Sequence, residues 1–471
     1  MGRAARIIGV GALVAALSAG GYAVADAYDV VPGVLTFAAA PAPPAPFPTA
    51  PGAAAAPALA PVLPALAATA PVPSSQAVDA LLNALVTDAR MGTSVGAVVM
   101  DQLTGDVLAQ HDPDVGRTPA STAKLTTAVA ALSAIGSDQT FVTRVVRGRA
   151  GQIVLVGGGD MMLSAGLGNP AVVNGRAGLA DLARATAREL ALEGVTTVSL
   201  AVDDTLFSGP ALSPDWDPSF LRTGVTAPIT ALAVNIGGLA DGFYPPRAPD
   251  PSLAAAAQFV TALAAAGVTV SGPPTRATTS AGAVELASVH SASLGEIVGY
   301  FLSTSDNVIT EVVARLVAID AGLPGSFAGA TQAVLAQART LGVDTAGAKL
   351  TDASGLGAGS VLPPRTLLGL LRLITDPAHP ELRQIAGALP IAGLRGTLSD
   401  RFVTSPARGF VRAKTGSLAH VTSLAGTVLD ADGRQLLFVV LADQTPAGGQ
   451  GAPRVAIDRF VAQLAGCGCG G

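Results

Sequence analysis

The sequence predicts an α+β fold built on an antiparallel sheet with helices packed against it. Residues 93–111 and 410–443 have strand-like alternation of apolar and polar residues, and they lie near opposite ends of the folded body. The sequence between them contains several helical patterns. Within it, residues 146–287 mix helix and strand patterns. We therefore expect a sheet that uses both ends of the body, with a large α/β insertion in the middle.

The individual elements follow from local patterns. Residues 76–90 place apolar side chains at helical spacing, and 93–111 reads as two strands joined by a turn at Thr104-Gly105-Asp106. A helix begins at Pro119-Ala120-Ser121. The same reasoning predicts strands at 151–159, 196–204, 410–418, 421–430 and 435–443, and helices at 177–194, 252–267, 295–317, 326–341 and 453–465. The predicted parts are a first body segment (76–145), the insertion (146–287), a second body segment (288–465) and a tail (466–471).

Composition excludes several classes of protein. The 471 residues allow two or three domains at roughly 100–200 residues each. A net charge of −5 without a basic stripe, and only 4% aromatic residues, argue against a nucleic-acid partner. The two cysteines, Cys467 and Cys469, cannot supply a disulfide framework or a four-ligand zinc site. We expect no cofactor and no metal.

The N-terminal sequence predicts export. Residues 1–27 combine Arg3 and Arg6 with an apolar run and a small-residue site at Ala23-Val24-Ala25, which is typical of a signal peptide. The run is also just long enough for a membrane anchor. Both readings place the folded body outside the cytoplasm, in the cell envelope or secreted. Residues 28–75 are rich in Ala and Pro and predict a semi-rigid linker, with a disordered leader as the alternative.

Lysine usage points to candidate functional residues. The 28 basic residues include three lysines, Lys124, Lys349 and Lys414, and the rest are arginine. Arginine stays charged in proteins, whereas lysine can become a neutral base. A lysine kept in such a chain is therefore expected to do something that arginine cannot.

Two of these lysines belong to a set of three short motifs. The motifs are Ser121-Thr122-Ala123-Lys124, Ser305-Asp306-Asn307 and Lys414-Thr415-Gly416. They match S-x-x-K, S-D-N and K-T-G, which serine acyl-transfer enzymes carry in this order. Each motif alone is weak, and alone Ser121 reads as a helix cap, Ser305 to Asn307 as a capping turn and Lys414 as an edge-strand lysine. The three together favour catalysis.

Each motif has a physical reason. Three residues apart at a helix start, Lys124 lies beside the Ser121 hydroxyl, and the helix N-terminus disfavours its positive charge. A neutral Lys124 can then take the proton of Ser121 and activate it as a nucleophile. Gly416 is expected to let a ligand approach the strand, and Lys414 and Thr415 to hold a substrate carboxylate.

The chain resembles the class C low-molecular-mass penicillin-binding proteins, which are D-alanyl-D-alanine carboxypeptidases and endopeptidases of the DacB type. The resemblance covers roughly residues 76–465 and includes PASTAKLTTAVAAL at 119–132, TDASGL at 351–356 and VRAKTGSLAHVTSLAGTV at 411–428. It implies a penicillin-binding/β-lactamase-like transpeptidase domain with an insertion between S-x-x-K and S-x-N. It also implies peptidoglycan stem peptides as substrates and β-lactams as inhibitors.

The resemblance also assigns roles to residues. Ser121 is the nucleophile, Lys124 the base, and the backbone N–H groups of Ser121 and Ser417 form the oxyanion hole. Ser305 relays a proton to the leaving amine, and Asn307 orients the substrate and Lys124. Lys414, Thr415 and Gly416 form the third element.

The chain departs from the family pattern after Asp352-Ala353-Ser354-Gly355-Leu356. Gly357 and Ala358 stand where the family has Ser-Arg, and that arginine suits a carboxylate on the stem side chain. Arg395 or Arg412 is a candidate substitute, and Asp203 or Asp204 is expected to hold a side-chain amine. Two alternative functions stay open: a β-lactamase-like hydrolase and a catalytically inactive wall-binding protein.

Overall fold

The computed structural model describes residues 19–28, 30–31, 68–242 and 244–468. The chain divides into two compact units, Met1–Pro64 and Ala65–Gly471. In the first unit residues 19–27 are helical, whereas residues 1–18 of the predicted export segment and 32–67 of the predicted linker lie outside the described residues. Throughout the described ranges, every helix is too short or too polar to cross a membrane.

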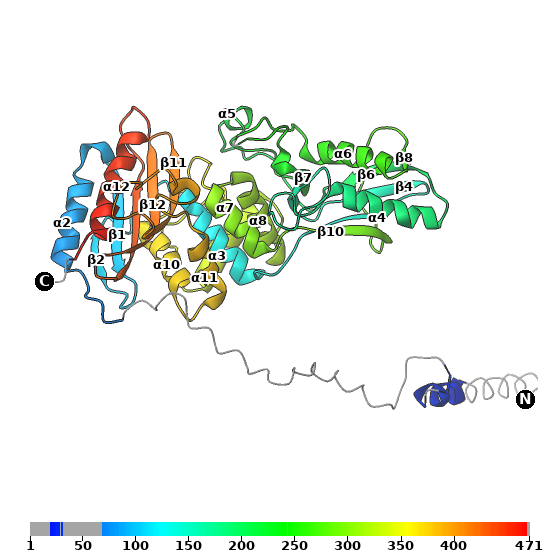
Figure 1. Ribbon diagram of the computed structural model, residues 1–471, viewed down its shortest axis with the longest axis horizontal. Helices are drawn as coiled ribbons and strands as arrows, with labels where there is room; N and C mark the ends of the chain where they lie inside the picture. The colour runs from blue at the N-terminus through cyan, green and yellow to red at the C-terminus, as the bar shows by residue number, and fades with distance from the viewer. Residues whose placement is uncertain (1–18, 29, 32–67, 243, 469–471) are drawn as a thin grey trace, which may run out of the picture. The chain divides into compact units, whose positions relative to one another are not determined.

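A five-stranded antiparallel sheet joins the two ends of the second unit, which confirms the predicted α+β class. Its strand order is β11-β12-β13-β1-β2 (Figure 1). The strands are β1 (Val95–Asp101), β2 (Val107–His111), β11 (Val411–Leu418), β12 (Val421–Leu429) and β13 (Gln435–Ala442). β1 pairs with β13 from Val95↔Ala442 to Asp101↔Leu436. The sheet is therefore complete only when both ends of the unit contribute their strands.

The two faces of this sheet belong to two different cores, because side chains alternate along each strand. On β13, Phe438 and Val440 pack into a core with Ile457 and Phe460. That core is covered by α2 (Ser75–Val86) and α12 (Gly451–Ala465). The intervening β13 residues, such as Val439, face a second and larger core formed with a helical layer.

The helical layer contains the segments that carry the first two motifs. Its helices are α3 (Lys124–Ala134), α7 (Leu294–Thr304), α8 (Asn307–Asp320), α9 (Phe327–Thr340), α10 (Pro364–Thr375) and α11 (Arg383–Ala388). The predicted helical stretch 295–317 is divided between α7 and α8. Ser305 adopts left-handed backbone angles (φ 61°, ψ 34°), and Asp306 accepts from Ile309 N at 2.8 Å as the N-cap of α8. This break sets the second motif at a helix junction.

A second sheet lies between the first and second motifs in sequence. Its order is β10-β3-β4-β6-β8, and β9 also pairs with β6. The strands are β3 (Val142–Arg147), β4 (Gln152–Val156), β6 (Thr197–Asp203), β8 (Thr269–Val270), β9 (Thr275–Arg276) and β10 (Glu285–His290). The sheet therefore includes residues on both sides of the predicted insertion boundaries at 146 and 287.

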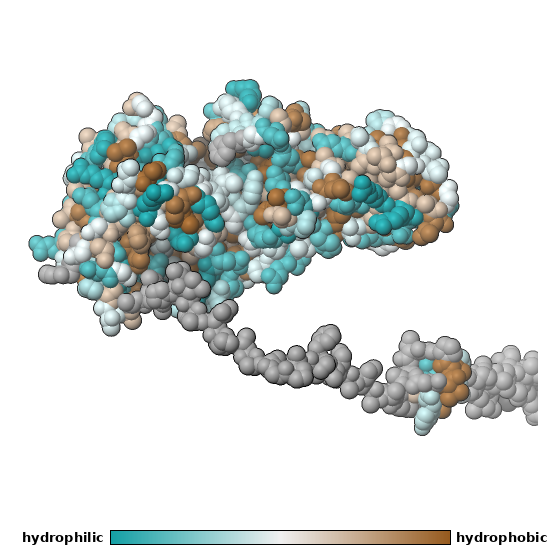
Figure 2. Space-filling model, viewed as in Figure 1, coloured by the Kyte–Doolittle hydropathy of each residue, from teal (hydrophilic) through white to brown (hydrophobic). Residues whose placement is uncertain are grey.

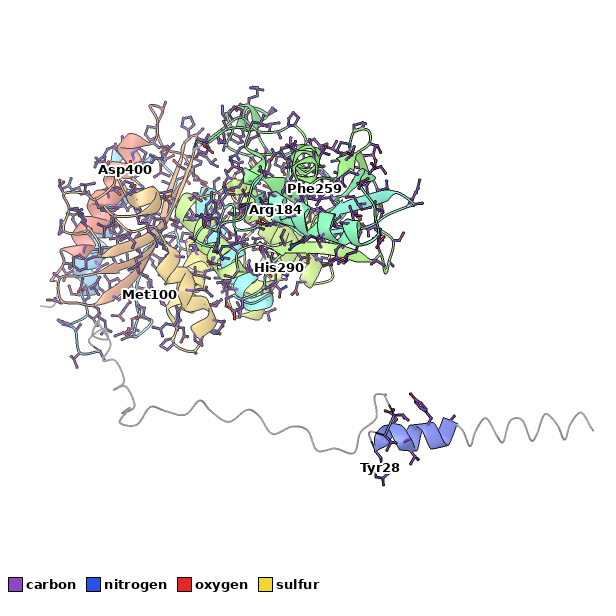
Figure 3. All side chains as sticks on the ribbon, turned by 45° about the vertical axis from the view of Figure 1, so that its right-hand side comes forward. Tyr28, Met100, Arg184, Phe259, His290 and Asp400 are labelled. Carbon is purple, nitrogen blue, oxygen red and sulfur yellow. The ribbon has the colours of Figure 1, made fainter. Side chains whose placement is uncertain are left out.

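Two helices cover one face of this second sheet. They are α4 (Leu179–Leu192) and α6 (Pro251–Ala265), whose buried Phe259 is labelled in Figure 3. Outside this sheet, two short strands form a parallel pair, β5 (Asp160–Leu163) with β7 (Leu232–Val234). The same part of the chain contains the short helix α5 (Ser219–Arg222). On the face shown in Figure 2, the described apolar side chains lie in small separate groups among polar ones. The large apolar clusters are internal.

Candidate active site

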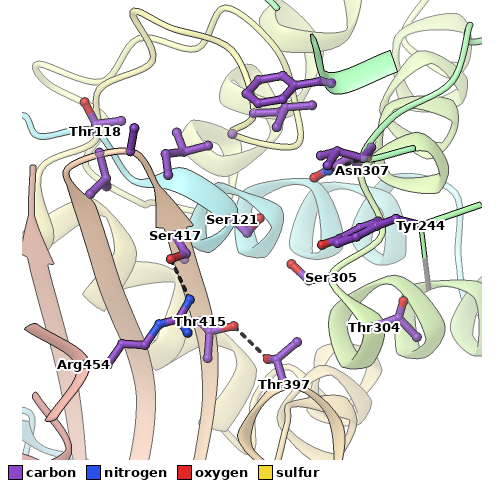
Figure 4. A pocket seen from close by; sticks show the side chains of 18 of the residues that line it. Thr118, Ser121, Tyr244, Thr304, Ser305, Asn307, Thr397, Thr415, Ser417 and Arg454 are labelled. Atoms are coloured by element: carbon purple, nitrogen blue, oxygen red, sulfur yellow. Dashed lines mark hydrogen bonds between the residues drawn. The ribbon is translucent and has the colours of Figure 1, made fainter. Parts of the chain in front are cut away.

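Ser121 stands at the start of the helical layer, in the first turn of a short 3₁₀ segment, η2 (Ala120–Ala123), that leads into α3. The preceding Ala120 has a positive φ of 46°. This geometry is held by a second loop, because a side chain at Gly355 would overlap Ala120 O. Ser121 lines a cleft of about 1280 Å³ (Figure 4). The predicted nucleophile is therefore accessible and rigidly placed.

Lys124 is fully buried directly beneath Ser121. Its Nζ lies 3.0 Å from Ser121 Oγ, 2.7 Å from Asn307 Oδ1 and 2.8 Å from the backbone oxygen of Ser354. The two carbonyl oxygens can only accept hydrogen bonds. A neutral amine therefore donates its two N–H groups to Asn307 Oδ1 and Ser354 O, and its lone pair faces the Ser121 hydroxyl. This is the arrangement that proton abstraction requires.

The protonation of Lys124 follows from its burial. Desolvation lowers the pKa of Lys124 to about 8, although the carboxylates of Asp352, Glu311 and Asp306 act in the opposite direction. The direction agrees with the expectation of a tuned lysine, and burial is the main cause. A substantial neutral fraction is therefore available near neutral pH.

The second motif reaches the first through Asn307. Its Oδ1 accepts from Lys124, and its Nδ2 donates to Val225 O at 3.0 Å. Ser305 turns the other way because of its left-handed backbone, and its Oγ accepts from Lys414 Nζ at 2.8 Å. The second motif thus contacts the first motif through Asn307 and the third through Ser305.

Lys414 belongs to the edge strand β11 and is also fully buried. Its Nζ donates to Ser305 Oγ and, at 2.9 Å, to Thr415 O. Burial and the nearby Lys124 hold the pKa of Lys414 well below its ordinary value. Lys414 is absent from the cleft lining, which includes Thr415, Gly416 and Ser417. Its direct partner is therefore Ser305.

Gly416 is required for internal packing. A side chain there would overlap Ser423 Oγ and lie 2.7 Å from Pro119 O, and Ser423 Oγ itself donates to Pro119 O at 2.7 Å. We expected a glycine here because a ligand must approach the strand. Internal packing is a second reason for a glycine at this position. Its missing side chain lets β11 and β12 contact the segment just before Ser121.

The edge of β11 presents backbone donors on one side. Ala413 N donates away from β12, to Pro390 O at 3.0 Å. Backbone groups alternate in direction along a strand, so the N–H groups of Thr415 and Ser417 point to the same open side. Ser417 lines the cleft, as does Ser121, whose N–H lies in a first helical turn. Both predicted oxyanion donors therefore belong to one cleft.

The sequence reasoning missed a buried carboxyl group that supports Lys124. Glu311 of α8 accepts from Ser354 N at 2.7 Å and from Ala353 N at 3.0 Å. Burial, reinforced by Asp352, raises the pKa of Glu311 above its ordinary value. Because Ser354 O accepts from Lys124, Glu311 positions one of the lysine's acceptors. A lone acidic residue in the apolar helical pattern NVITEVVARLVAI was the available signal.

The other candidate stem-binding residues lie elsewhere. The cleft lining contains Ala358, Asp215 and Asp217, but none of the four residues suggested from the sequence. Asp203 bonds to Thr205 and Thr279, Asp204 pairs with Arg276, and Arg395 donates to backbone oxygens at the C-terminal end of α11. Arg412 lies on β11 outside the lining. Neither of the two arginines suggested as substitutes, Arg395 and Arg412, is therefore among the described lining residues.

The described ranges contain no group of three or more His, Cys, Asp and Glu side chains arranged to hold a metal ion.

The fold and the serine–lysine geometry define a serine acyl-transfer enzyme of the penicillin-binding type. The chain matches the family model for D-Ala-D-Ala carboxypeptidase 3 (S13) over residues 78–248 and 244–464. It belongs to this family, which confirms the resemblance drawn from the motifs and makes the protein a serine-type D-Ala-D-Ala carboxypeptidase.

Similar proteins span most of the chain. It is 38% identical over 415 residues to a carboxypeptidase of Mycobacterium tuberculosis, covering 86% of this chain and 87% of that one. It is 36% identical over 410 residues to carboxypeptidase DacB of Mycolicibacterium smegmatis, covering 85% and 86%. The fold is similar to the crystal structure of penicillin binding protein 4 (dacB) from Haemophilus influenzae, with a TM-score of 0.68, 22% identity and coverage of 80% and 97%.

Proposed function

We propose that this protein is an exported serine DD-peptidase that removes the terminal D-alanine from peptidoglycan stem peptides through an acyl-serine intermediate. The observation that carries the proposal is the fully buried Lys124, whose Nζ lies 3.0 Å from Ser121 Oγ with two carbonyl acceptors fixing its other contacts. Family membership supplies the D-Ala-D-Ala bond as the scissile bond.

Acylation begins with proton transfer from Ser121 Oγ to neutral Lys124 as the oxygen attacks the carbonyl carbon of the penultimate D-alanine. The N–H groups of Ser121 and Ser417 stabilise the charge that develops on the carbonyl oxygen. Ser305 delivers its proton to the leaving amine of the terminal D-alanine and takes one from Lys414, whose Nζ donates to its Oγ. Water then attacks the acyl-serine ester. Its proton returns to Lys414, and the proton held by Lys124 goes back to the departing serine oxygen, which restores the Ser121 hydroxyl.

The same chemistry extends to two further reactions. Cleavage of a peptide cross-link needs the same acyl-serine intermediate with a larger leaving group. Reaction with a β-lactam forms an ester on the same serine, and the amine released by ring opening stays attached to the acyl group. We propose slow hydrolysis of that ester, which separates this function from the β-lactamase-like alternative.

The arrangement of the site also argues against the second alternative, an inactive wall-binding protein. All five catalytic candidates are present in two adjacent hydrogen-bonded sets, Ser121 with Lys124 and Asn307, and Ser305 with Lys414. A site that had lost its function would not need to keep two desolvated lysines, because burying a charged group is costly.

The test is mass spectrometry of the protein after benzylpenicillin, with the adduct mapped to a peptide. We expect one adduct on the peptide that contains Ser121. Ser121→Ala is expected to lose both the adduct and peptidase activity while keeping the wild-type unfolding temperature. The matched control is Ser280→Ala, at an exposed serine outside the cleft lining. An adduct on another residue would overturn the assignment.

We also propose a weakened preference for a free carboxylate on the stem side chain. Ala358 lines the cleft and donates its N–H to Asp215 O at 3.2 Å. The neighbouring lining residues Asp215 and Asp217 are acidic. An amidated and uncharged side chain meets less repulsion there than a carboxylate does.

A further inference from the structure

The leaving D-amino acid carries an α-carboxylate that needs a cationic partner in the cleft. The sequence suggested Lys414 for this purpose. The structure directs Lys414 Nζ to Ser305 Oγ and Thr415 O, in full burial and outside the cleft lining. Thr415 and Ser417 offer only neutral donors. The positive charge must therefore come from another element.

Of the described residues that line the cleft, Arg401 and Arg454 are the cationic ones. Arg401 is already ion-paired with Asp458. Arg454 donates to Ser417 Oγ at 2.8 Å and has no carboxylate oxygen within 4.0 Å in the described chain (Figure 4). It therefore stands as an unpaired cation at the edge of β11, next to the residue after Lys-Thr-Gly.

The position of Arg454 in α12 does not stabilise the helix. Gln450 is the N-cap of α12, so Arg454 is the fourth helical residue. A positive side chain near a helix N-terminus is unfavourable, because the backbone N–H groups there already carry partial positive charge. Arg454 is exposed to solvent. Desolvation and the neighbouring Arg401 lower its pKa, whereas Asp400 and Asp458 act in the opposite direction. An anion bound beside Arg454 offsets the unfavourable positive charge at the start of the helix.

A polar contact fixes the start of α12 against the site. Gln450 donates through Nε2 to Leu418 O at 2.8 Å and accepts from Thr422 Oγ1, which ties the helix to the turn between β11 and β12. Arg454 is thereby held at a constant place relative to Ser417. An ordinary surface arginine has no such support.

We propose that Arg454 is a specificity-determining residue that binds the α-carboxylate of the leaving D-amino acid, together with the hydroxyl groups of Ser417 and Thr415. This inference rests on the proposed function, and it assigns the charge recognition to α12 instead of to Lys414. Thr415 Oγ1 is oriented by Thr397 Oγ1 at 2.7 Å. The three donors would surround one carboxylate at the rim of the cleft.

The experiment compares two peptides that end in D-Ala-D-Ala, one with a free terminal carboxylate and one with a terminal carboxamide. We expect Arg454→Ala to lower kcat/KM for the free acid by about 10- to 100-fold, the range expected for hydrogen bonds to charged groups. Activity on the carboxamide should stay within about twofold of wild type. Arg454→Lys should recover part of the free-acid activity, because it keeps the charge but loses the planar fork.

Arg459→Ala is the matched control, since Arg459 is an exposed arginine of the same helix outside the cleft lining. It should behave as wild type on both peptides. Equal losses on the acid and the carboxamide in Arg454→Ala would overturn the inference, because they would indicate a positioning effect on Ser417. A wild-type protein that neither cleaves these peptides nor forms a Ser121 adduct would overturn the proposed function, and this inference with it.

Discussion

Replacing Lys124 by arginine tests the central feature of the site. The lysine lies fully buried with three oxygen atoms within 3.0 Å of Nζ. A guanidinium stays protonated in proteins and cannot act as a neutral base. It is also too large for a space sized for one ammonium group. We expect Lys124→Arg to be nearly as damaging as Lys124→Ala.

The magnitude follows from the pKa. At an ordinary value of 10.5 only about 0.03% of the lysine is neutral at pH 7, whereas at about 8 the neutral fraction is about 10%. Burial thus increases the reactive form by about 300-fold. General base catalysis contributes about 10²- to 10⁴-fold to a rate, and we expect the arginine variant to lose acylation in that range.

The assay is the rate of acylation by a fluorescent penicillin, followed from pH 6 to 9, with thermal unfolding as the control for folding. The wild-type rate should rise with pH, because deprotonation of Lys124 creates the base, and it should level off above about pH 8. Rates of Lys124→Arg within a few-fold of wild type, or a wild-type profile that is flat over this range, would refute the base role.

Three further outcomes are expected. Burial raises the pKa of Asp160 to about 7, and its Oδ2 has no hydrogen-bond partner. The unfolded chain loses this proton near pH 4, so the folded state loses stability as pH rises from about 4 to about 7. The full penalty is about 4 kcal/mol at pH 8 and nearly absent at pH 4, and an unpaired amide costs about 1–3 kcal/mol at both, so Asp160→Asn should gain about 1–3 kcal/mol at pH 8 and lose about 1–3 kcal/mol at pH 4. Urea unfolding at both pH values checks this, and an equal gain at both would contradict it. Gly416→Ala should cost about 1–3 kcal/mol and slow acylation, because the new methyl group overlaps Ser423 Oγ, whereas Gly387→Ala, with open space around it, should do neither. Finally, kcat/KM on matched stems should differ little between free and amidated diaminopimelate; a tenfold preference for the free acid would show that a carboxylate-binding group faces Ala358 after all.

The sequence alone determined the class of fold and the identity of the reacting groups. Alternation in 93–111 and 410–443 is a local property, so both ends of the main sheet were predictable. The three motifs were recognisable because serine–lysine chemistry demands those residue types, and the scarcity of lysine emphasised Lys124 and Lys414. Their roles stay proposals that the experiments above address.

Some local structure was not predicted although its signal was present. α10 carries Leu367, Leu370, Leu371 and Ile374 at helical spacing, and all four are buried. β3 and β10 are short, and each is followed or preceded by polar turns, so their pairing across more than a hundred residues gave no local pattern. Long-range pairing of this kind depends on the partner strand and is invisible in a single segment.

Tertiary structure alone decided how each motif acts. Burial gives Lys124 its low pKa, and it depends on α8 and the Asp352–Gly355 loop, which lie far from Lys124 in sequence. The left-handed turn at Ser305 separates Asn307, which contacts Lys124, from Ser305, which contacts Lys414. Arg454 reaches Ser417 from the last helix, and no spacing rule connects them. Burial of a side chain and contact between residues distant in sequence arise only when the chain packs. Residue types therefore indicate the reaction, whereas the fold decides the charge and the contacts of each group.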